Sequence, residues 1–390
     1  MCIRDRVEPK ELTVAEEILA FGALQASLVE WLAQPPGPVV VVDDAGPTPF
    51  GSGEPPPGVQ LVRHSHNQGP AAARNTGLAH VSTPLVAFVD TDVTPDADWL
   101  QPLLPHFADP RVALVAPRVV GAPGPTPVHT YEQRHSSLDL GDEPARIAAG
   151  TRVSYVPAAA LVCRADALRA VDGFDATMRV GEDVDLVWRL ADAGQRCRYE
   201  PTAQVRHTPR ATLAAWCRQR VGYGRSAAPL AQRHPGALAP LRMSGWSALA
   251  WVLLVARHPL LATGVATGTT VALVRKLHDL PPRDAALLAL RGHAAAGGQF
   301  ADAVVRVWWP LAAVAALFVP RLRPAVAAAF VLPAAVAAVR QRSPQPLADL
   351  PLSTLDRMSY GVGVWRGVLD LREVGPLLPD LTNWPPRGGG

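Results

Sequence analysis

Short apolar runs that end in aspartate recur in the first half of the chain and alternate with helical segments. Val39–Val42 leads into Asp43 and Asp44, and Leu85–Val89 leads into Asp90. Runs this short, bounded by turn-forming residues, predict strands buried in a sheet. Alternation at the spacing of βαβ units predicts an α/β fold whose sheet is mixed and mostly parallel. The aspartates would then gather at the carboxyl edge of the sheet, where open α/β sheets bind ligands.

Further elements are expected from the same periodicities. A helical pattern over 12–32 ends at Pro35–Pro36, and the Pro-rich polar stretch 121–150 predicts a mobile loop over the site. We expect further strands at 59–62, 112–115, 155–156 and 158–163, and helices at 69–80, 98–107, 165–171 and 182–193.

The second half of the chain is much more apolar than the first. Its apolar segments are 244–256, 260–274, 307–319 and 325–339. Each is shorter than the roughly 20 residues that a membrane-spanning helix needs. Buried core helices would explain them, but we favour membrane association, because Trp308–Trp309 resembles an interfacial pair and Arg340 and Arg342 lie at a helix end. The predicted regions are an N-terminal helix (1–35), a globular domain (36–235), membrane-associated helices (236–345) and an irregular tail (346–390), whose last residues, 388–390, are expected to be disordered.

Charge and cysteine content exclude several classes of protein. The formal net charge of +3 is too small to indicate a nucleic-acid partner. The four cysteines have neither zinc-site spacing nor the density of a disulfide scaffold, which predicts reduced thiols. The first residues do not resemble a signal peptide. We therefore expect the catalytic part to lie on the cytoplasmic side of the cell membrane.

Three motifs carry candidate chemistry. Asp90-Thr-Asp92 places two carboxylates at a strand end, a hard-oxygen arrangement that suits Mg²⁺ or Mn²⁺. Asn67–Gly77 places a glycine turn before a helix that carries Arg74, whose guanidinium can reach a nucleotide. Gly181–Arg189 contains a cluster of acidic residues at a helix start, where they complement the helix dipole. Together these motifs indicate an enzyme that uses a nucleotide sugar.

In order and spacing the same motifs resemble family 2 glycosyltransferases, which have the GT-A fold, over residues from about 36 to 225. The resemblance implies that Asp43, Asp44, Arg74 and Asp90 bind the nucleotide of a UDP-hexose donor. It implies further that Asp92 binds the metal.

For the acceptor side, the resemblance implies that Asp183 is the base that deprotonates the acceptor, with Glu182 beside it. A single displacement of this kind inverts the anomeric carbon. His207 resembles a histidine that completes the metal shell in some relatives. Arg189 resembles an arginine that braces the acidic loop.

A narrower resemblance concerns the acceptor. The segments 136–141, 155–160 and 173–175 are similar to the subfamily of mycofactocin gene clusters. That similarity implies transfer of glucose from UDP-glucose to a small, peptide-derived redox cofactor. A polyprenyl phosphate or a cell-surface polysaccharide is the alternative acceptor, and a non-catalytic nucleotide-binding membrane protein is the alternative of another class.

The first strand of the family's fold is expected to be missing from this chain, since only Arg4–Arg6 resembles its end.

A second class of enzyme, the dehalogenase-like phosphatases, also uses an aspartate pair at a strand end. That mechanism needs a lysine between its two motifs, and none occurs between Asp92 and Gly181.

Overall fold

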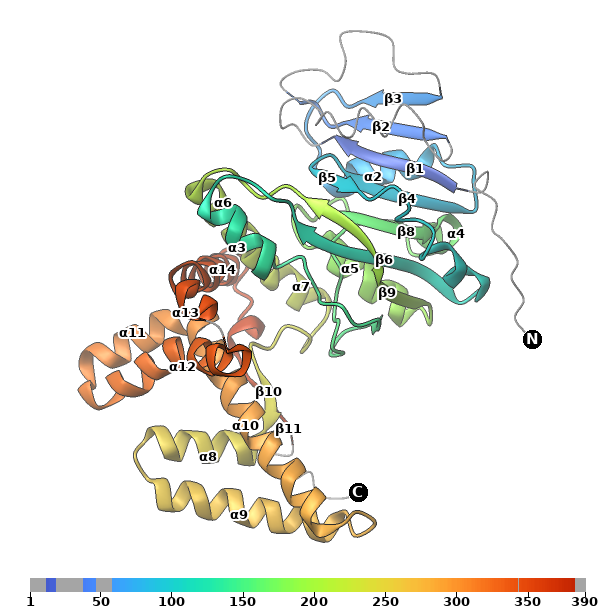
Figure 1. Cartoon of the computed structure of the whole chain (residues 1–390). Coiled ribbons are helices and arrows are strands. Elements are labelled where there is room, and N and C mark those ends of the chain that lie inside the picture. The colour runs from blue at the N-terminus through green and yellow to red at the C-terminus, as the bar shows by residue number, and fades with distance from the viewer. Residues whose placement is uncertain (1–11, 19–37, 47–57, 343, 383–390) are drawn as a thin grey trace. The chain divides into compact units, whose positions relative to one another are not determined.

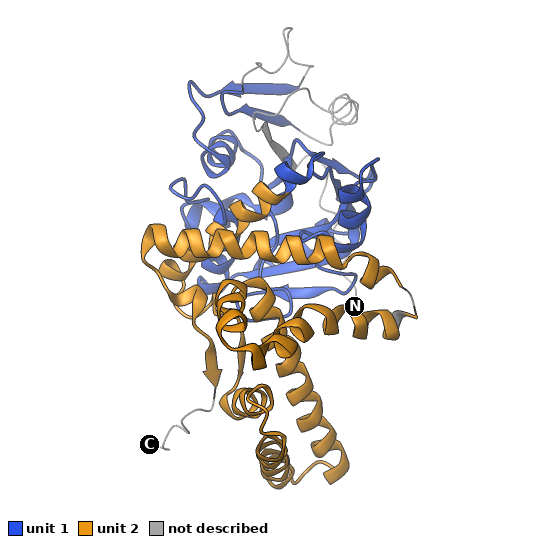
Figure 2. Ribbon diagram, turned by 90° about the vertical axis from the view of Figure 1, so that its left-hand side faces the viewer, with its two compact units in different colours: residues 1–216 blue, residues 217–390 orange. Residues whose placement is uncertain are grey.

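The computed structural model describes residues 12–18, 38–46, 58–342 and 344–382, with side chains left out for 12–18 and Gln341. The chain divides into two compact units, residues 1–216 and 217–390 (Figure 2). The first contains the α/β sheet and the second is mostly helical. This agrees with the predicted change of character in the second half.

The first unit is built on a mixed sheet (Figure 1), which has nine strands within the described residues. Its order is β3-β2-β1-β4-β8-β6-β9-β5, with β7 paired to β9. The pairs β3–β2, β2–β1, β1–β4 and β6–β9 are parallel. The strands are β1 (Leu12–Ile18), β2 (Val39–Asp43), β3 (Val59–Arg63), β4 (Leu85–Asp90), β5 (Val93–Pro95), β6 (Val112–Gly121), β7 (Ala145–Ile147), β8 (Ala160–Arg164) and β9 (Arg196–His207).

The expected fold class is confirmed by this sheet, and its core follows from the apolar runs. Every residue of β2 is buried, and so is every residue of β4 except Asp90 at its end. Apolar runs of this kind lose both faces to the protein interior, at about 25 cal/mol for each Å² of apolar surface removed from water. The helices α2 (Pro70–Ala79), α4 (Ala165–Ala170) and α5 (Glu182–Asp192) lie where the sequence predicts them.

The expectation of a helix over 12–32 and of a missing first strand is wrong where the structure describes the chain. Leu12–Ile18 forms β1, which pairs in parallel with β2 on one side and β4 on the other. β1 lies between β2 and β4. Without it, the backbone N–H and C=O groups on the facing edges of those two strands would have no hydrogen-bond partners, and unpaired backbone groups inside a sheet are costly. Tertiary pairing thus overrides the local helical pattern. Residues 19–37 lie outside the described residues.

Between β4 and β9 the structure is more ordered than expected. The stretch 121–150, predicted as a mobile loop, contains α3 (Pro127–His135) and β7. Thr126 caps α3, since its side chain accepts a hydrogen bond from the His129 N–H, and Pro127 occupies the first turn, where proline is tolerated. The predicted helix over 98–107 is instead turns followed by a short 3₁₀ helix, η2 (Leu104–Ala108), and 155–156 forms no strand.

Strand direction brings the predicted site residues to one edge. β2, β1 and β4 are parallel, and two successive antiparallel pairings through β8 make β6, and with it β9, parallel to β4. The carboxyl ends of β2, β4 and β9 therefore meet at the same edge of the sheet. There β5 pairs with β9 so that Val93 lies opposite His207, which brings His207 beside Asp92.

The second unit is helical, with one small parallel pair of strands, β10 (Arg242–Ser244) and β11 (Asp380–Thr382). The expectation of an irregular tail after 344 is wrong, because this part of the chain contains α13 and α14. Residues 388–390, expected to be disordered, lie outside the described residues. The helices are α6 (Leu213–Arg225), which begins in the first unit, and α7 (Ala227–Arg233), α8 (Gly245–Val255), α9 (Pro259–Lys276), α10 (Pro282–Arg306), α11 (Trp309–Phe318), α12 (Arg323–Gln341), α13 (Gln345–Ala348) and α14 (Leu350–Leu371).

Helix α14 packs through glycine. A Cβ built on Gly363 would lie 2.1 Å from the carbonyl oxygen of Val221, and one on Gly361 would lie 2.2 Å from that of Arg306. Only glycine permits backbones to approach this closely. A segment rich in glycine, which looks irregular from local propensity, is therefore a packed helix.

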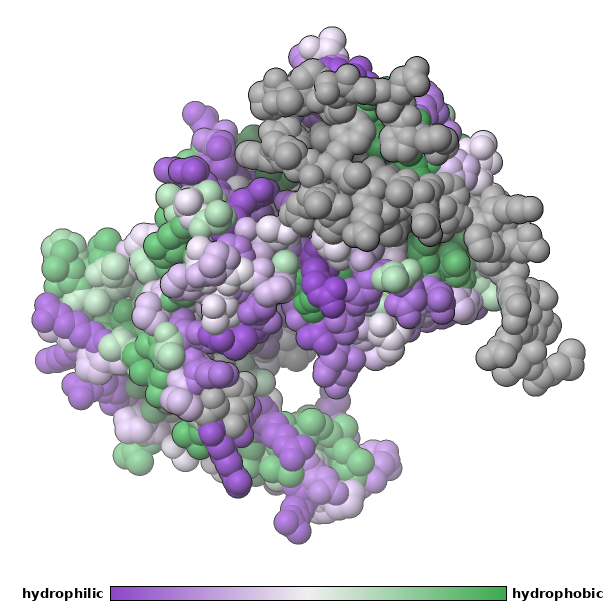
Figure 3. All heavy atoms as spheres, turned by 45° about the horizontal axis from the view of Figure 1, so that its top comes forward, coloured by the Kyte–Doolittle hydropathy of each residue, from purple (hydrophilic) through white to green (hydrophobic). Residues whose placement is uncertain are grey.

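Much apolar surface on the second unit faces outward. No residue of α11 is buried. Leu317 and Phe318, at its end, are 66% and 77% exposed. Figure 3 shows hydrophobic surface gathered on the α11–α12 pair, at the left of the view. The alternative that these segments are buried core helices is therefore wrong for α11 and for the window of Pro320–Arg340.

By length and composition, Pro320–Arg340 is one helical stretch of 21 residues that is apolar enough to cross a membrane. Its mean hydropathy is 1.9, and none of its apolar window is buried. α10 and α11 pass the same test only as a pair, bent by 88°. Among the described residues this is weak evidence for one membrane span, or two.

Candidate active site

Asp43 and Asp44 order the loop that follows β2. Asp44 is fully buried, and its carboxylate accepts hydrogen bonds from the backbone N–H groups of Gln68 (2.8 Å) and Gly69 (2.7 Å). His64 lies 2.8 Å from the same carboxylate. Asp43 is also buried and accepts a hydrogen bond from the Gly46 N–H at 2.9 Å. These contacts tie the end of β2 to the glycine turn that begins α2.

Arg74 on α2 bridges two carboxylates from distant parts of the chain. Its Nη1 donates to Glu182 Oε1 and its Nη2 donates to Asp90 Oδ1, both at 2.8 Å. Only 4% of its side chain is exposed, and the guanidinium carbon lies 5.4 Å from the centre of the Phe174 ring. A planar guanidinium can serve two carboxylates at once where an ammonium cannot. Arg74 therefore joins α2, β4 and α5 at one point.

Asp92 and His207 form the second part of the site. His207 Nε2 lies 3.4 Å from Asp92 Oδ2, and Arg210 Nη2 lies 3.4 Å from the same oxygen. Burial disfavours the charged form of Asp92, but the hydrogen bond and charge of His207 and the charge of Arg210 outweigh it, so the pKa of Asp92 is lowered. Asp92 is thus held as a carboxylate.

The ring of His207 is buried, and its Nδ1 has no hydrogen-bond partner among the described residues. If the proton is on Nε2, the ring donates to Asp92 and leaves the Nδ1 lone pair without a partner. If the proton is on Nδ1, the Nε2 lone pair faces a carboxylate oxygen, an arrangement that a cation between them would make favourable. The pair therefore has the donor chemistry of a metal shell.

Asp183 lies in the first turn of α5, behind Gly181, whose φ of 84° is in the left-handed region. Its carboxylate accepts hydrogen bonds from the backbone N–H groups of Val184 (2.8 Å) and Ala158 (3.2 Å). Burial, and then the charge of Glu182, raise the pKa of Asp183 to about 7. Because an efficient general base has a pKa near the working pH, this environment suits proton transfer.

Asp90 is also harder to ionise than an ordinary aspartate. Burial raises its pKa, the charge of Arg74 opposes this, and the charges of Asp92 and Glu182 add to it. The charges of Asp92 and Glu182 thus act on Asp90, and the charge of Glu182 acts on Asp183. Arg74 opposes the rise in pKa of both Asp90 and Asp183. The structure brings six of the residues that the sequence nominated into contact or charge interaction, Arg74, Asp90, Asp92, Glu182, Asp183 and His207. Asp43 and Asp44 lie at the end of β2, at the same edge of the sheet.

Arg189, expected to brace the acidic segment, makes contacts of that kind. It donates to Asp185 Oδ2 at 2.7 Å and to the carbonyl oxygens of Val171 and Gly173, the latter at 2.8 Å. These bonds hold the turn before Phe174 against α5.

Sequence reasoning missed three residues at this site. His64 contacts Asp44, Phe174 stacks on Arg74, and Arg210 approaches Asp92. Phe174 follows Gly173, whose φ is 65°, and Gly-Phe after a helix was a visible signal of a tight turn. Arg210 lies three residues after His207, so its proximity to the metal motif was a second signal. His64 had none.

Comparisons with known proteins show the family to which the chain belongs. A model of the family described as glycosyl transferase family 2 matches residues 34–169. The chain is 45% identical over 360 residues to the pre-mycofactocin glycosyltransferase of Mycobacterium tuberculosis, in strains ATCC 25618 / H37Rv and CDC 1551 / Oshkosh. The alignment covers 88% of this chain and 77% of that relative. The chain therefore belongs to the family 2 glycosyltransferases, and the resemblance to the mycofactocin subfamily is confirmed.

Solved structures resemble the chain more distantly. The mannosyltransferase PcManGT from Pyrobaculum calidifontis, in complex with GDP-Man and Mn²⁺, is 20% identical with a TM-score of 0.41, covering 84% of this chain and 86% of that one. S. aureus TarS 1-349 is 15% identical with a TM-score of 0.41, covering 57% and 64%. Both scores are below 0.5, so neither likeness bears on the substrate.

Proposed function

We propose that this enzyme is an inverting glycosyltransferase that moves glucose from UDP-glucose to a small, peptide-derived acceptor of the mycofactocin type. The observation that supports this acceptor is the 45% identity to the pre-mycofactocin glycosyltransferase. In the reaction, the acceptor oxygen bonds to the anomeric carbon as the bond to the diphosphate breaks. Asp183 takes the proton of the acceptor hydroxyl, with Glu182 held beside it by Arg74.

The donor would lie along the carboxyl edge of the sheet. Asp43 and Asp44 have their oxygens engaged by the protein, so we propose that they act by ordering the nucleotide loop. Arg74 on α2, whose Nη atoms are engaged by Glu182 and Asp90, would position Asp90 at the end of β4 toward the nucleotide.

A divalent cation, Mg²⁺ or Mn²⁺, would neutralise the charge that grows on the leaving diphosphate. No group of three or more His, Cys, Asp or Glu side chains that could hold a metal ion occurs in the part of the chain that the structure describes. Asp92 and His207 nevertheless fit such an ion, because Mg²⁺ is commonly bound by one or two protein groups with phosphates completing its shell. We propose that these two residues are its protein ligands.

Replacing Asp92 by alanine is expected to weaken UDP binding in the presence of Mg²⁺ or Mn²⁺ by roughly 10–100-fold. Without metal, Asp92→Ala and wild type should bind UDP equally weakly. Titration calorimetry with and without EDTA measures both. Asp98→Ala, an exposed carboxylate six residues away, is the control. Equal metal-dependent binding by Asp92→Ala and wild type would remove Asp92 from the metal site.

A mass-spectrometric screen decides the substrates. Purified enzyme is incubated with UDP-glucose, other nucleotide hexoses, and either the peptide-derived cofactor precursor or a polyprenyl phosphate. Our proposal expects a mass increase of one hexose or more on the cofactor precursor with UDP-glucose. Transfer only to the polyprenyl phosphate would establish the alternative acceptor.

We propose also that the second unit attaches the enzyme to the cytoplasmic face of the cell membrane, which the exposed apolar helices support. Leu317→Gln with Phe318→Gln should reduce sedimentation with lipid vesicles by roughly tenfold or more, since each buried side chain of this size contributes about 1.5–3 kcal/mol. Leu369→Gln, at a residue that is 72% exposed on α14, is the matched control. Unchanged sedimentation of the double variant would count against attachment through α11.

A further inference from the structure

A pocket of about 720 Å³ in the first unit lies away from the carboxylate site. Four arginines line it, Arg111, Arg146, Arg196 and Arg198, and no acidic side chain among the described residues does so. The pocket lies where β6 and β9 begin, whereas His207 lies where β9 ends. Along a strand of this length the two places are roughly 30 Å apart. The pocket is therefore separate from the proposed donor site.

Strand register crowds the positive charges on one face. In the antiparallel β7–β9 pair, Arg146 lies directly opposite Arg198. Directly opposed residues point to the same side of a sheet, and Arg196, two residues from Arg198, shares that side. Like charges placed opposite each other destabilise a sheet. This arrangement is unfavourable unless an anion offsets it.

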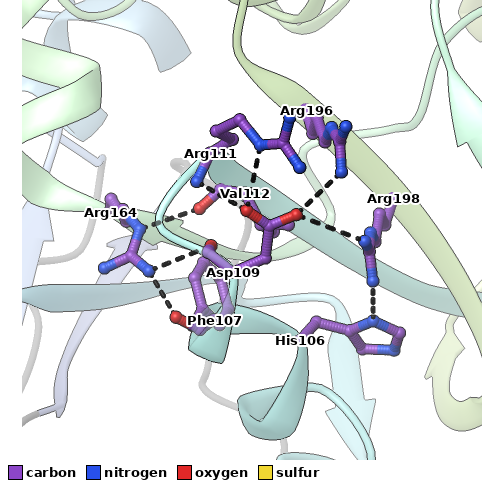
Figure 4. Close-up of polar contacts among 8 residues, drawn as sticks. All are labelled: His106, Phe107, Asp109, Arg111, Val112, Arg164, Arg196 and Arg198. Carbon is purple, nitrogen blue, oxygen red and sulfur yellow. Dashed lines mark hydrogen bonds and ion pairs between the residues drawn. The ribbon is translucent and has the colours of Figure 1, made fainter.

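One carboxylate, Asp109, serves three of these arginines (Figure 4). Its oxygens lie 2.8 Å from Arg196, 3.3 Å from Arg111 and 3.7 Å from Arg198. The pKa of Asp109 is lowered, first by the backbone N–H of Arg111, so it is ionised at neutral pH. Arg146 is exposed, and its guanidinium makes no hydrogen bond or ion pair with the residues that the structure describes, although its carbonyl oxygen accepts one from Thr151. Asp109 thus pairs with three of the four lining arginines and leaves Arg146 without a carboxylate among the described residues.

Neighbouring contacts hold the arginines in place. Arg198 Nη1 donates to His106 Nδ1 at 3.0 Å, and His106 Nε2 donates to Glu200 Oε2 at 3.0 Å. Arg164 donates hydrogen bonds to the carbonyl oxygen of Val112 at 2.9 Å and to that of Phe107 (Figure 4). These two bonds fix the turn that carries Asp109. The guanidinium groups of Arg111, Arg196 and Arg198 are therefore preorganised, and preorganised guanidinium forks match the oxygens of phosphate.

We propose that this pocket binds a phosphoryl anion, carried either by a free phosphate compound or by a lipid headgroup. Arg146 supplies the uncompensated guanidinium, and Arg196 and Arg198 approach the anion from the adjacent strand. The oxygens of a phosphoryl group can accept hydrogen bonds from several guanidiniums at once, including that of Arg146, which Asp109 does not contact. The site does not depend on the proposed sugar donor or acceptor.

The test uses the full chain in EDTA, which disables metal-dependent binding at the carboxylate site. Wild type should show a higher Tm in sodium phosphate than in sodium chloride of the same ionic strength. Arg146→Gln should bind phosphate roughly tenfold more weakly, because a charge-assisted hydrogen bond is lost, and Arg146→Lys should retain part of the effect. Arg291→Gln, at an exposed arginine of α10, is the control and should behave as wild type.

Vesicles distinguish the source of the phosphoryl group. Sedimentation is measured on phosphatidylcholine vesicles with and without phosphatidylglycerol, so that apolar attachment cancels. A phosphatidylglycerol-dependent gain that Arg146→Gln loses, without any response to free phosphate, assigns the site to a lipid headgroup. A Tm response to phosphate that depends on Arg146 assigns it to a free phosphate compound. If neither signal depends on Arg146, the proposal is wrong.

Discussion

Replacing Asp183 by asparagine is expected to lower the rate of glycosyl transfer by roughly 10²–10⁴-fold, the usual contribution of a positioned general base. The amide is nearly isosteric and can still accept the N–H bonds of Ala158 and Val184 through its oxygen. UDP binding should therefore be unchanged. Transfer rates and UDP affinity are measured on the same preparations.

Asp192→Asn is the matched control, because Asp192 lies on the same helix, at its exposed end. It undergoes the same chemical change and should transfer at the wild-type rate. Transfer by Asp183→Asn at the wild-type rate would show that Asp183 is not the base.

The wild-type rate should also depend on pH with a defined sign. Because the pKa of Asp183 is raised to about 7, its base form is lost as the pH falls below 7. We expect kcat/KM to rise with pH up to about 7 and then level off. The raised pKa means that the folded chain holds this proton more tightly than the unfolded chain, so the contribution of Asp183 to stability falls as pH rises from about 4 to about 7. Asp183→Asn should lose that component.

Replacing Arg74 by methionine should destabilise the fold by about 3–5 kcal/mol, as expected when one partner of a buried ion pair is removed. Asp90 and Glu182 would then be left close together without a counter-charge. Denaturant unfolding measures the loss, which should be smaller at pH 5 than at pH 8, because the pKa of Asp90 is raised and its protonation removes one of the two charges. Transfer should be lost as well.

A second substitution separates charge from packing. If Arg74 acts by pairing charge, Arg74→Met combined with Glu182→Gln should be more stable than Arg74→Met alone, which a double-mutant cycle reports as coupling. Arg291→Met, at an exposed arginine of α10, should change stability little. A stability loss for Arg74→Met that is the same at both pH values and in both backgrounds would assign Arg74 to packing only.

Local pattern was sufficient wherever one element was strongly periodic. β2 and β4 are continuous apolar runs, and α5 begins with an acidic turn, so their positions were predictable. Local pattern failed at β1, where Leu12–Ile18 reads as helix, because its strand form depends on the open positions beside β2 and β4. It failed again at α14, where close backbone packing selects glycine.

The sequence by itself determined the class of enzyme through its resemblance to family 2 glycosyltransferases. It also nominated the residues that carry the proposed chemistry, because aspartates at strand ends and an acidic helix start are local motifs. Only the tertiary structure decided how those residues are held. Arg74 contacts Glu182 across 108 residues of chain and Asp90 across 16, and His207 reaches Asp92 through the pairing of β9 with β5. Such contacts depend on strand order and register, which are properties of the whole sheet and of no single segment.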